Sequence, residues 1–270
     1  GRSIDFAINL VNGQTDRVFA GGIAVSLMHE RFLRNNKWAG VRFIKGLLDK
    51  SPAESLMLNQ YEEELYSEDV TGTPIEDMIP DYSILDQVDY EYPINDAYFA
   101  YASRGCIRKC KFCGVPKLEG DQRDAPPITK VVRGIIQDSG EKKDLILMDN
   151  NVVASANYKN IIAEIRDIGF QKGAKLERNG KMIKRRVDFN QGVDARILCK
   201  DPMFLKEMST IEISPLRIAF DHLGLKKQYS QAMQYSADVG ITNLSNYMLY
   251  NFHDSPADLF ERMRLNVTLN

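Results

Sequence analysis

The sequence predicts an α/β protein in which strands and helices alternate along the chain. Three observations indicate this class. From residue 97 onward, apolar strand-like segments alternate with amphipathic helical segments, at roughly 30 residues per unit. Residues 1–50 show the same alternation in shorter pieces. With 44% apolar residues in 270, the chain can fill an ordinary core. Alternating strands and helices are typical of parallel sheets.

The first 50 residues predict part of a parallel α/β sheet. Strands are expected at 17–22 and 40–43, and helices at 23–35 and 44–50. The first strand ends in Gly21-Gly22, which can be a plain tight turn or can let a ligand approach the backbone. Because the chain starts inside an apolar segment and stops just after a helical pattern, we expect both ends to be cut.

Residues 51–96 predict an irregular acidic linker. No Lys or Arg occurs between Ser51 and Ser103, whereas Asp and Glu recur throughout, and four prolines interrupt any periodic pattern. A solvated linker is one interpretation. Contact with the basic loop that follows is the other.

The region after Asn95 predicts five strands, each followed by a helix. The expected strands are 97–103, 144–149, 186–190, 216–221 and 246–252, and the expected helices after the first strand are 128–139, 158–169, 202–209, 226–240 and 256–265. A right-handed series of such units curls into a barrel or partial barrel, although an open doubly wound sheet gives the same order.

A basic hairpin interrupts this series before the third strand. Asn179-Gly180 is the signal for a two-residue turn. The flanking cations are Lys172, Lys175, Arg178, Lys181, Lys184, Arg185 and Arg186. The hairpin is predicted to be either a solvated charged element or a flap on an anionic substrate.

Composition narrows the class of protein. A net charge of -2 argues against nucleic-acid binding through an overall positive field, although local patches remain open. No apolar run approaches the roughly 20 residues that cross a bilayer, so we predict a cytoplasmic protein without a membrane partner. The chain has four cysteines, and three of them stand close together. That clustering favours metal or redox chemistry over a disulfide framework.

Cys106, Cys110 and Cys113 can direct three sulfurs at one centre, and thiolates select zinc or iron–sulfur chemistry. A structural zinc site needs four ligands, and Cys199, in an apolar context, is predicted to be a core residue. Three ligands on a four-iron cluster leave one iron open. Five cations surround these cysteines, namely Arg104, Arg108, Lys109, Lys111 and Lys117. Their positive charge can favour the thiolate over the thiol and offset the negative charge of a bound cluster. The alternative is that they are ordinary exposed residues of the loop.

The motif Cys106-x-x-x-Cys110-x-Phe112-Cys113 at the end of a strand resembles CxxxCxΦC of the radical S-adenosylmethionine superfamily, over roughly residues 97–270. Three further segments resemble sequences of the subgroup with an N-terminal cobalamin-binding domain. They are "SRGC" before the motif, "DNN" after the second strand and "PDYSILD" upstream. The DxHxxG motif of that domain is absent, since Asp221-His222-Leu223-Gly224 has the wrong spacing and place. Cobalamin binding therefore stays open.

The resemblance implies a partial (β/α)6 TIM-like barrel preceded by a partial Rossmann-like α/β segment. Its implied parts are a cobalamin-binding-like segment at 1–50, the acidic linker at 51–96, and a radical SAM barrel at 97–270 truncated after the fifth βα unit. It also implies a [4Fe-4S] cluster on Cys106, Cys110 and Cys113, and S-adenosylmethionine on the free iron. A low-potential electron donor of flavodoxin or ferredoxin type is the expected partner. The substrate is unknown, and the charge of the basic hairpin points to an anionic one.

The resemblance implies cofactor contacts at strand ends, where active sites of βα barrels lie. Asp149 is expected at the methionine amino group, Asp221 near the ribose or methionyl part, and Arg196 on the carboxylate. Further cofactor-binding candidates are Phe112, Asn150, Asn151 and Asn190. Each Asp or Asn can instead cap a helix or fix a turn.

The predicted function is reductive cleavage of S-adenosylmethionine to a 5′-deoxyadenosyl radical and hydrogen abstraction from substrate, with methyl or sulfur transfer among the outcomes. One alternative is a non-catalytic zinc or iron–sulfur module whose basic hairpin contacts RNA. The other alternative is an inactive fragment.

Overall fold

A computed structural model of the chain describes residues 2–46, 74–250 and 252–269, which fall into two compact units. The first unit contains Gly1–Met78 together with Cys113–Gly120, and the second contains Ile79–Phe112 together with Asp121–Asn270. The division into parts at 1–50, 51–96 and 97–270 stays a prediction. No helix among the described residues combines the length and apolar character that a membrane crossing requires.

The first unit carries a short parallel sheet, as predicted. β1 (Phe19–Ala20) pairs with β2 (Arg42–Phe43), and Ile4, Val18 and Val41 form a small core beside them. The helical elements are α1 (Arg2–Leu10), η1 (Thr15–Arg17), α2 (Ile23–Leu27), α3 (His29–Leu33), η2 (Asn36–Trp38), η4 (Ile75–Asp77) and α6 (Val115–Leu118).

Two elements of the first unit differ from the sequence prediction. The helix predicted at 23–35 is divided at Met28, whose φ of -123° and ψ of 30° end α2 before α3 begins. Residues 2–10 form a helix that was not predicted. Its apolar residues recur at helical spacing, and Ile4 is buried in the core of this unit. The helix predicted at 44–50 lies partly outside the described residues.

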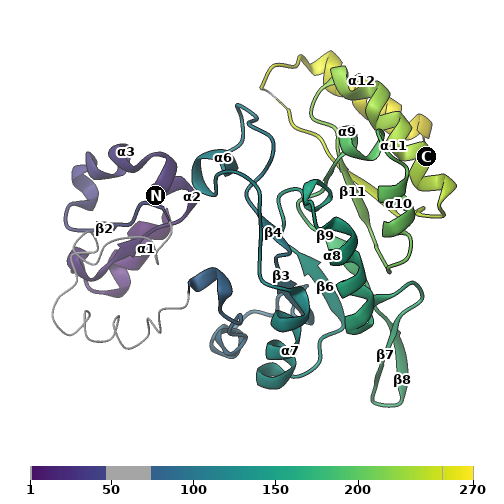
Figure 1. The fold of residues 1–270 in the computed structure, drawn as a ribbon. Helices are drawn as coiled ribbons and strands as arrows, with labels where there is room; N and C mark the ends of the chain where they lie inside the picture. The colour runs from purple at the N-terminus through teal and green to yellow at the C-terminus, as the bar shows by residue number, and fades with distance from the viewer. Residues whose placement is uncertain (1, 47–73, 251, 270) are drawn as a thin grey trace. The chain divides into compact units, whose positions relative to one another are not determined.

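The second unit is built on parallel strands (Figure 1). One sheet has the order β3-β6-β9 and the other the order β10-β11-β12. The strands are β3 (Ala97–Ala100), β6 (Asp144–Leu147), β9 (Val187–Phe189), β10 (Val193–Asp194), β11 (Leu216–Ala219) and β12 (Leu244–Tyr247). β9 pairs with β6. β10, which begins after three intervening residues, pairs with β11, so this stretch of chain links the two sheets.

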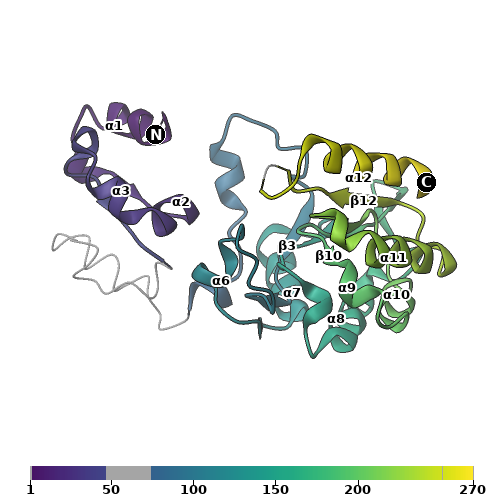
Figure 2. The same ribbon diagram turned by 90° about the horizontal axis from the view of Figure 1, so that it is seen from above.

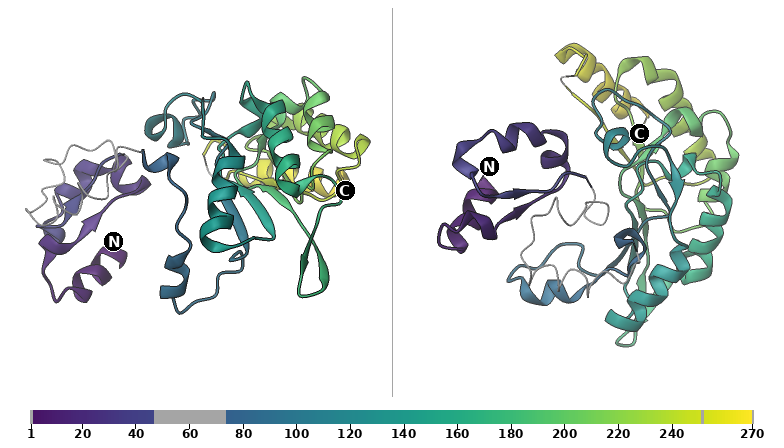
Figure 3. Two further views of the ribbon diagram at one scale, coloured as in Figure 1. Left: turned by 60° about the horizontal axis from the view of Figure 1, so that its bottom comes forward. Right: turned by 60° about the vertical axis from the view of Figure 1, so that its left-hand side comes forward.

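Helices follow the strands in the predicted alternation. They are α7 (Ile128–Ser139), η6 (Val152–Ala154), α8 (Tyr158–Ile165), η7 (Arg166–Phe170), α9 (Ala195–Leu198), α10 (Met203–Met208), η8 (Leu223–Leu225), α11 (Lys226–Asp238) and α12 (Pro256–Leu269). Figures 2 and 3 show α7, α8, α10 and α11 following one another along one side of the strands. Among the described strands none pairs β12 with β3, so closure into a barrel stays a prediction.

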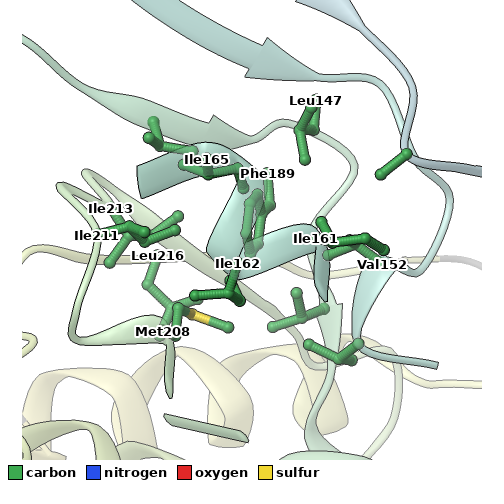
Figure 4. Close-up of a cluster of buried hydrophobic side chains, with 14 of the residues drawn as sticks. Leu147, Val152, Ile161, Ile162, Ile165, Phe189, Met208, Ile211, Ile213 and Leu216 are labelled. Carbon is green, nitrogen blue, oxygen red and sulfur yellow. The ribbon is translucent and has the colours of Figure 1, made fainter. Parts of the chain in front are cut away.

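Apolar spacing explains why these helices pack on the sheets. In α7 the buried residues are Ile128, Val131, Val132 and Ile135, and in α8 they are Tyr158, Ile161, Ile162 and Ile165. Both sets repeat the i, i+3, i+4, i+7 spacing of one helix face. Figure 4 shows the α8 isoleucines among Leu147 of β6 and Phe189 of β9. Each fully buried side chain of this size contributes about 1.5–3 kcal/mol to folding.

The basic hairpin forms where the sequence predicts it. β7 (Lys175–Arg178) pairs with β8 (Lys181–Lys184), and Asn179 and Gly180 have the positive φ angles of 53° and 72° that a type I′ turn requires. It precedes β9 and so lies at the amino-terminal edge of the strands (Figure 1). Its cations bind acidic partners at that edge: Arg178 pairs with Asp96, Lys184 with Glu212, Arg185 with Glu141, and Arg186 with Asp144.

The last strand is the main correction to the predicted elements. The sequence predicts it at 246–252, but β12 spans Leu244–Tyr247, because Leu244 pairs with Leu216 and fixes the register on β11. Asn251 lies outside the described residues. Elements not predicted are α6, β10, α9 and an antiparallel pair of β4 (Ser103–Arg104) with β5 (Arg123–Asp124).

The described part of the acidic linker docks on β3. It contains η5 (Ser83–Gln87) and no strand. The Tyr82 hydroxyl donates to the Ala97 carbonyl at 2.8 Å and accepts the Phe99 N–H at 2.9 Å. This side chain therefore satisfies backbone groups of β3 that no strand in the described part of the chain pairs.

Candidate functional site

The cysteine loop (residues 105–112) follows β4 and contains no helix or strand. Cys106 and Cys110 are partly exposed, and neither forms a disulfide. The Arg108 N–H donates to Cys106 Sγ at 3.4 Å, which closes a tight local turn. Cys113 is the first residue of the segment that belongs to the other unit. Within the described residues, no three His, Cys, Asp or Glu side chains are grouped closely enough to hold a metal ion.

Asp149 anchors the start of the cysteine loop. This carboxylate, 3% exposed, accepts the Ala102 N–H at 2.9 Å, the Ser103 N–H at 2.5 Å and the Ser103 hydroxyl at 2.7 Å. Burial raises the pKa of Asp149 to about 6, although these hydrogen bonds favour the ionised form. Since both oxygens already accept from the protein, the structure gives Asp149 a positioning role. The predicted contact with a methionine amino group stays a prediction.

Asn150 and Asn151, which follow Asp149, also support the start of the cysteine loop. The Asn150 side-chain amide donates to the Gly105 carbonyl at 3.3 Å, directly before Cys106. Gln122 Nε2 donates to the Asn151 carbonyl at 3.1 Å and to the Ser103 hydroxyl at 3.3 Å. Asn151 is 4% exposed, and its Oδ1 has no hydrogen-bond partner among the described residues. The "DNN" segment thus fixes the backbone from which the cysteine loop departs.

An ion-pair triad ties the cysteine loop to the end of β10. Asp194 accepts Arg108 Nε at 2.7 Å on one oxygen and Arg196 Nε at 2.7 Å on the other. The Arg196 N–H also donates to this carboxylate at 2.9 Å, so Asp194 is the N-cap of α9. Burial raises the pKa of Asp194, but the hydrogen bonds from both arginines outweigh it and hold the pKa below its ordinary value.

Arg196 is electrostatically linked to two other predicted site residues. Its hydrogen bond to Asp194 raises the pKa of Arg196 most, and the charges of Cys110 and Asp221 raise it further. Asp221 lies two residues after the end of β11, and burial raises the pKa of Asp221 against the opposing charge of Arg196. Arg196 therefore lies within electrostatic range of both Asp221 and Cys110, near the carboxyl-terminal ends of the strands.

Asn190 lies at the same edge but is engaged locally. Its side-chain amide contacts Met148 Sδ at 3.7 Å, and its carbonyl accepts the Tyr247 hydroxyl at 2.6 Å. Phe112, 42% exposed, packs edge-on against Phe252 with 5.3 Å between ring centroids, and Phe252 in turn contacts His253. Phe252, in the segment after β12, thus contacts the aromatic residue of the cysteine motif.

Sequence reasoning missed the residues that support the predicted ones, namely Ser103, Gln122, Asp194, Tyr247 and Phe252. An acid two residues before an arginine in "GVDAR" was the only local signal for Asp194. A cavity of about 500 Å³ lies elsewhere, between the first turns of α8 and α10, and is lined by none of the predicted site residues.

Comparisons with known proteins give limited similarity. No family model and no curated protein matches the chain. Among solved structures, one match is TsrM from Kitasatospora setae, a radical S-adenosylmethionine methyltransferase with cobalamin and a [4Fe-4S] cluster bound. The match covers 63% of this chain and 32% of TsrM, at 13% identity and a TM-score of 0.46. SuiB from Streptococcus suis, bound to its precursor peptide SuiA, matches 92% of this chain and 50% of its own, at 14% identity and a TM-score of 0.46. The chain thus spans half or less of the length of these two proteins.

Proposed function

We propose that this chain belongs to a radical S-adenosylmethionine enzyme that binds a [4Fe-4S] cluster through Cys106, Cys110 and Cys113. The observation that carries the proposal is the CxxxCxΦC spacing in the loop that follows the first of a series of parallel strands. Asp149, Arg196 and Asp221 stand at the carboxyl-terminal ends of those strands, the edge at which βα proteins place their ligands.

The residues present fit such a cluster in chemistry. Thiolates are the ligands that iron–sulfur clusters take, and no disulfide occupies any of the three thiols. Because residues 105–112 form no helix or strand, gathering the sulfurs around a cluster breaks no regular backbone hydrogen bonds. Arg108 and Arg196 supply positive charge beside a centre whose thiolate ligands make it negative.

The side chains at the strand ends have distinct tasks in this mechanism. When bound and reduced, the cluster supplies the electron that cleaves S-adenosylmethionine and yields the radical that takes hydrogen from substrate. Asp149 holds Ala102 and Ser103, and so fixes where the cysteine loop begins. Arg196 uses Nε on Asp194, which leaves its two Nη groups to bind a carboxylate. Phe112 and Phe252 pack edge-on and place apolar surface beside the motif.

Reconstitution under anaerobic conditions tests the proposal. We expect the full chain to take up iron and sulfide, and, with dithionite and S-adenosylmethionine, to form 5′-deoxyadenosine. Serine variants at Cys106, Cys110 and Cys113 should each lose iron, whereas C199S should keep it. Stoichiometric zinc without sulfide, or a loaded protein that makes no 5′-deoxyadenosine, would overturn the proposal.

The finer parts of this function belong to the same proposal. Methyl or sulfur transfer to an unidentified substrate, and electron supply from a flavodoxin or ferredoxin, would follow if the cluster forms. Cobalamin binding has the weaker basis, because the sequence lacks DxHxxG. The alternative of an RNA-contacting hairpin is less favoured, because Arg178, Lys184, Arg185 and Arg186 pair with acidic residues of the chain itself.

A further inference from the structure

Asp194 connects two segments that are far apart in the sequence. Its partner Arg108 stands between Cys106 and Cys110, 86 residues before it in the chain. Its other partner, Arg196, begins the short helix α9. With 9% of its surface exposed, Asp194 is buried, and a buried carboxylate with two guanidinium partners is held much more strongly than an exposed ion pair.

Both arginines bind Asp194 through Nε, which fixes how each guanidinium is turned. Among the described residues, the Nη nitrogens of Arg108 and Arg196 form no hydrogen bond that competes with a ligand. Each side chain is about one-third exposed, at 34% for Arg108 and 33% for Arg196. One carboxylate therefore orients two guanidinium groups and leaves both available at the cysteine loop.

A second ion pair in the same unit provides a contrast. Asp188 of β9 binds Arg217 of β11 through both Nε and Nη, at 2.8 and 2.7 Å. This pair joins the two sheets and includes no residue of the cysteine loop. Its geometry is as good as that of the Asp194 triad, so it reports the effect of losing a carboxylate–arginine pair without disturbing the loop.

We propose that Asp194 is a positioning residue for the cluster site. It acts through Arg108, which holds the Cys106–Cys110 loop against the end of β10, and through Arg196, whose guanidinium it orients by the hydrogen bond to Nε. This inference rests on the proposed function for its ligand, and on the triad for its geometry. Without Asp194, the loop loses its tie to β10 and Arg196 loses its orientation.

The first experiment compares wild type with D194N, D194E and D188N as full-length reconstituted proteins. Electron paramagnetic resonance of the reduced cluster, titrated with S-adenosylmethionine, gives an affinity and a spectrum for each. We expect D194N to weaken the affinity about tenfold, as loss of a charge-assisted hydrogen bond predicts, and to change the spectrum. D194E should recover part of the affinity, and D188N should match wild type.

A second measurement does not need the cluster. Trypsin cleaves after Arg and Lys, so the cleavage rate at Arg108 and Lys109 in the cluster-free full chain reports how often the loop opens. We expect this rate to rise roughly threefold or more in D194N, and to stay at the wild-type value in D188N. In the double variant R108Q/D194N, cleavage after Lys109 should equal that in R108Q, because Asp194 acts on the loop through Arg108.

The outcomes separate the inference from the proposed function. If wild type binds no cluster, the proposed function fails, while the cleavage rates still test whether Asp194 holds the loop. If wild type binds the cluster and D194N keeps both its affinity and its spectrum, the inference is wrong. Should D194N fail to fold by circular dichroism, R108Q takes its place, and unchanged cluster retention in R108Q would overturn the inference.

Discussion

The carboxylate of Asp149 accepts both the backbone N–H and the hydroxyl of Ser103, which joins the end of β6 to the chain just after β3. These two strands are neighbours in one sheet, and the cysteine loop starts two residues further on. The start of the loop is therefore held by a buried charge as well as by the pairing of β4 with β5.

The titration of Asp149 should appear in the stability of the protein. Burial raises the pKa of Asp149 from 3.8 to about 6, so the folded state binds this proton more tightly than the unfolded state. The associated stabilisation is fully present below pH 3.8 and is lost as the pH rises through about 6. We expect the free energy of unfolding of wild type, relative to D149N, to fall between pH 4 and pH 7 in urea titrations. A difference that does not change with pH would contradict this assignment.

Removal of the Ser103 hydroxyl should weaken the same anchor. In S103A the Asp149 carboxylate keeps both backbone N–H donors but loses the 2.7 Å hydroxyl bond. A hydrogen bond to a charged group contributes about 1.5–3 kcal/mol, so the free energy of unfolding at pH 7 should fall by that amount. S139A, at the partly exposed last residue of α7, serves as the control and should change it by less than about 0.5 kcal/mol.

Arg262 should be the most sensitive residue of α12. Its guanidinium is fully buried and donates to the carbonyls of Phe220 and Leu249, each at 2.6 Å, and to Asp254. R262M leaves Asp254 buried without its partner, so it should lower the free energy of unfolding by about 3–5 kcal/mol. Two residues further on, Arg264 pairs with Glu261 at the surface, and R264M should cost less than about 1 kcal/mol. If chemical denaturation showed R262M and R264M to lose the same free energy of unfolding, the result would contradict this prediction.

The core beneath α8 offers a test of packing. Ile162 is 0% exposed and packs in the cluster that contains Leu147 and Phe189 (Figure 4). I162A should lower the free energy of unfolding by about 2–5 kcal/mol, because it removes buried methyl groups and leaves a cavity. Ile136 of α7 is 42% exposed, so I136A should cost much less in the same denaturation experiment.

The hairpin should be dispensable for cleavage of S-adenosylmethionine. Lys175 and Lys181 are exposed on β7 and β8, at the amino-terminal edge of the strands, whereas the cysteine loop follows their carboxyl-terminal ends. We expect K175E/K181E to form 5′-deoxyadenosine at the wild-type rate in an assay without substrate. A loss of activity with unchanged iron content would give the hairpin a functional role.

Local patterns in the sequence predicted many of the elements correctly. The spacing of Ile128, Val131, Val132 and Ile135 predicts α7, because a helix places such residues on one face. Asn179-Gly180 predicts the hairpin turn, because both residues tolerate positive φ. The three cysteines and Phe112 could be recognised as a candidate site because their significance lies in spacing along a single loop.

Only the tertiary structure decided what these residues touch. The pairing of Arg108 with Asp194, the burial of Arg262 and the register of Leu244 on β11 each join residues distant in sequence. The same holds for the hairpin, whose cations find their acidic partners at the edge opposite the cysteine loop. Periodicity and turn propensity act over a few residues, whereas the partner of a buried charge depends on which strand ends become neighbours when the sheets assemble. The sequence alone therefore determined the thiol motif and most of the longer helices and strands, and the folded arrangement determined which charges support that motif.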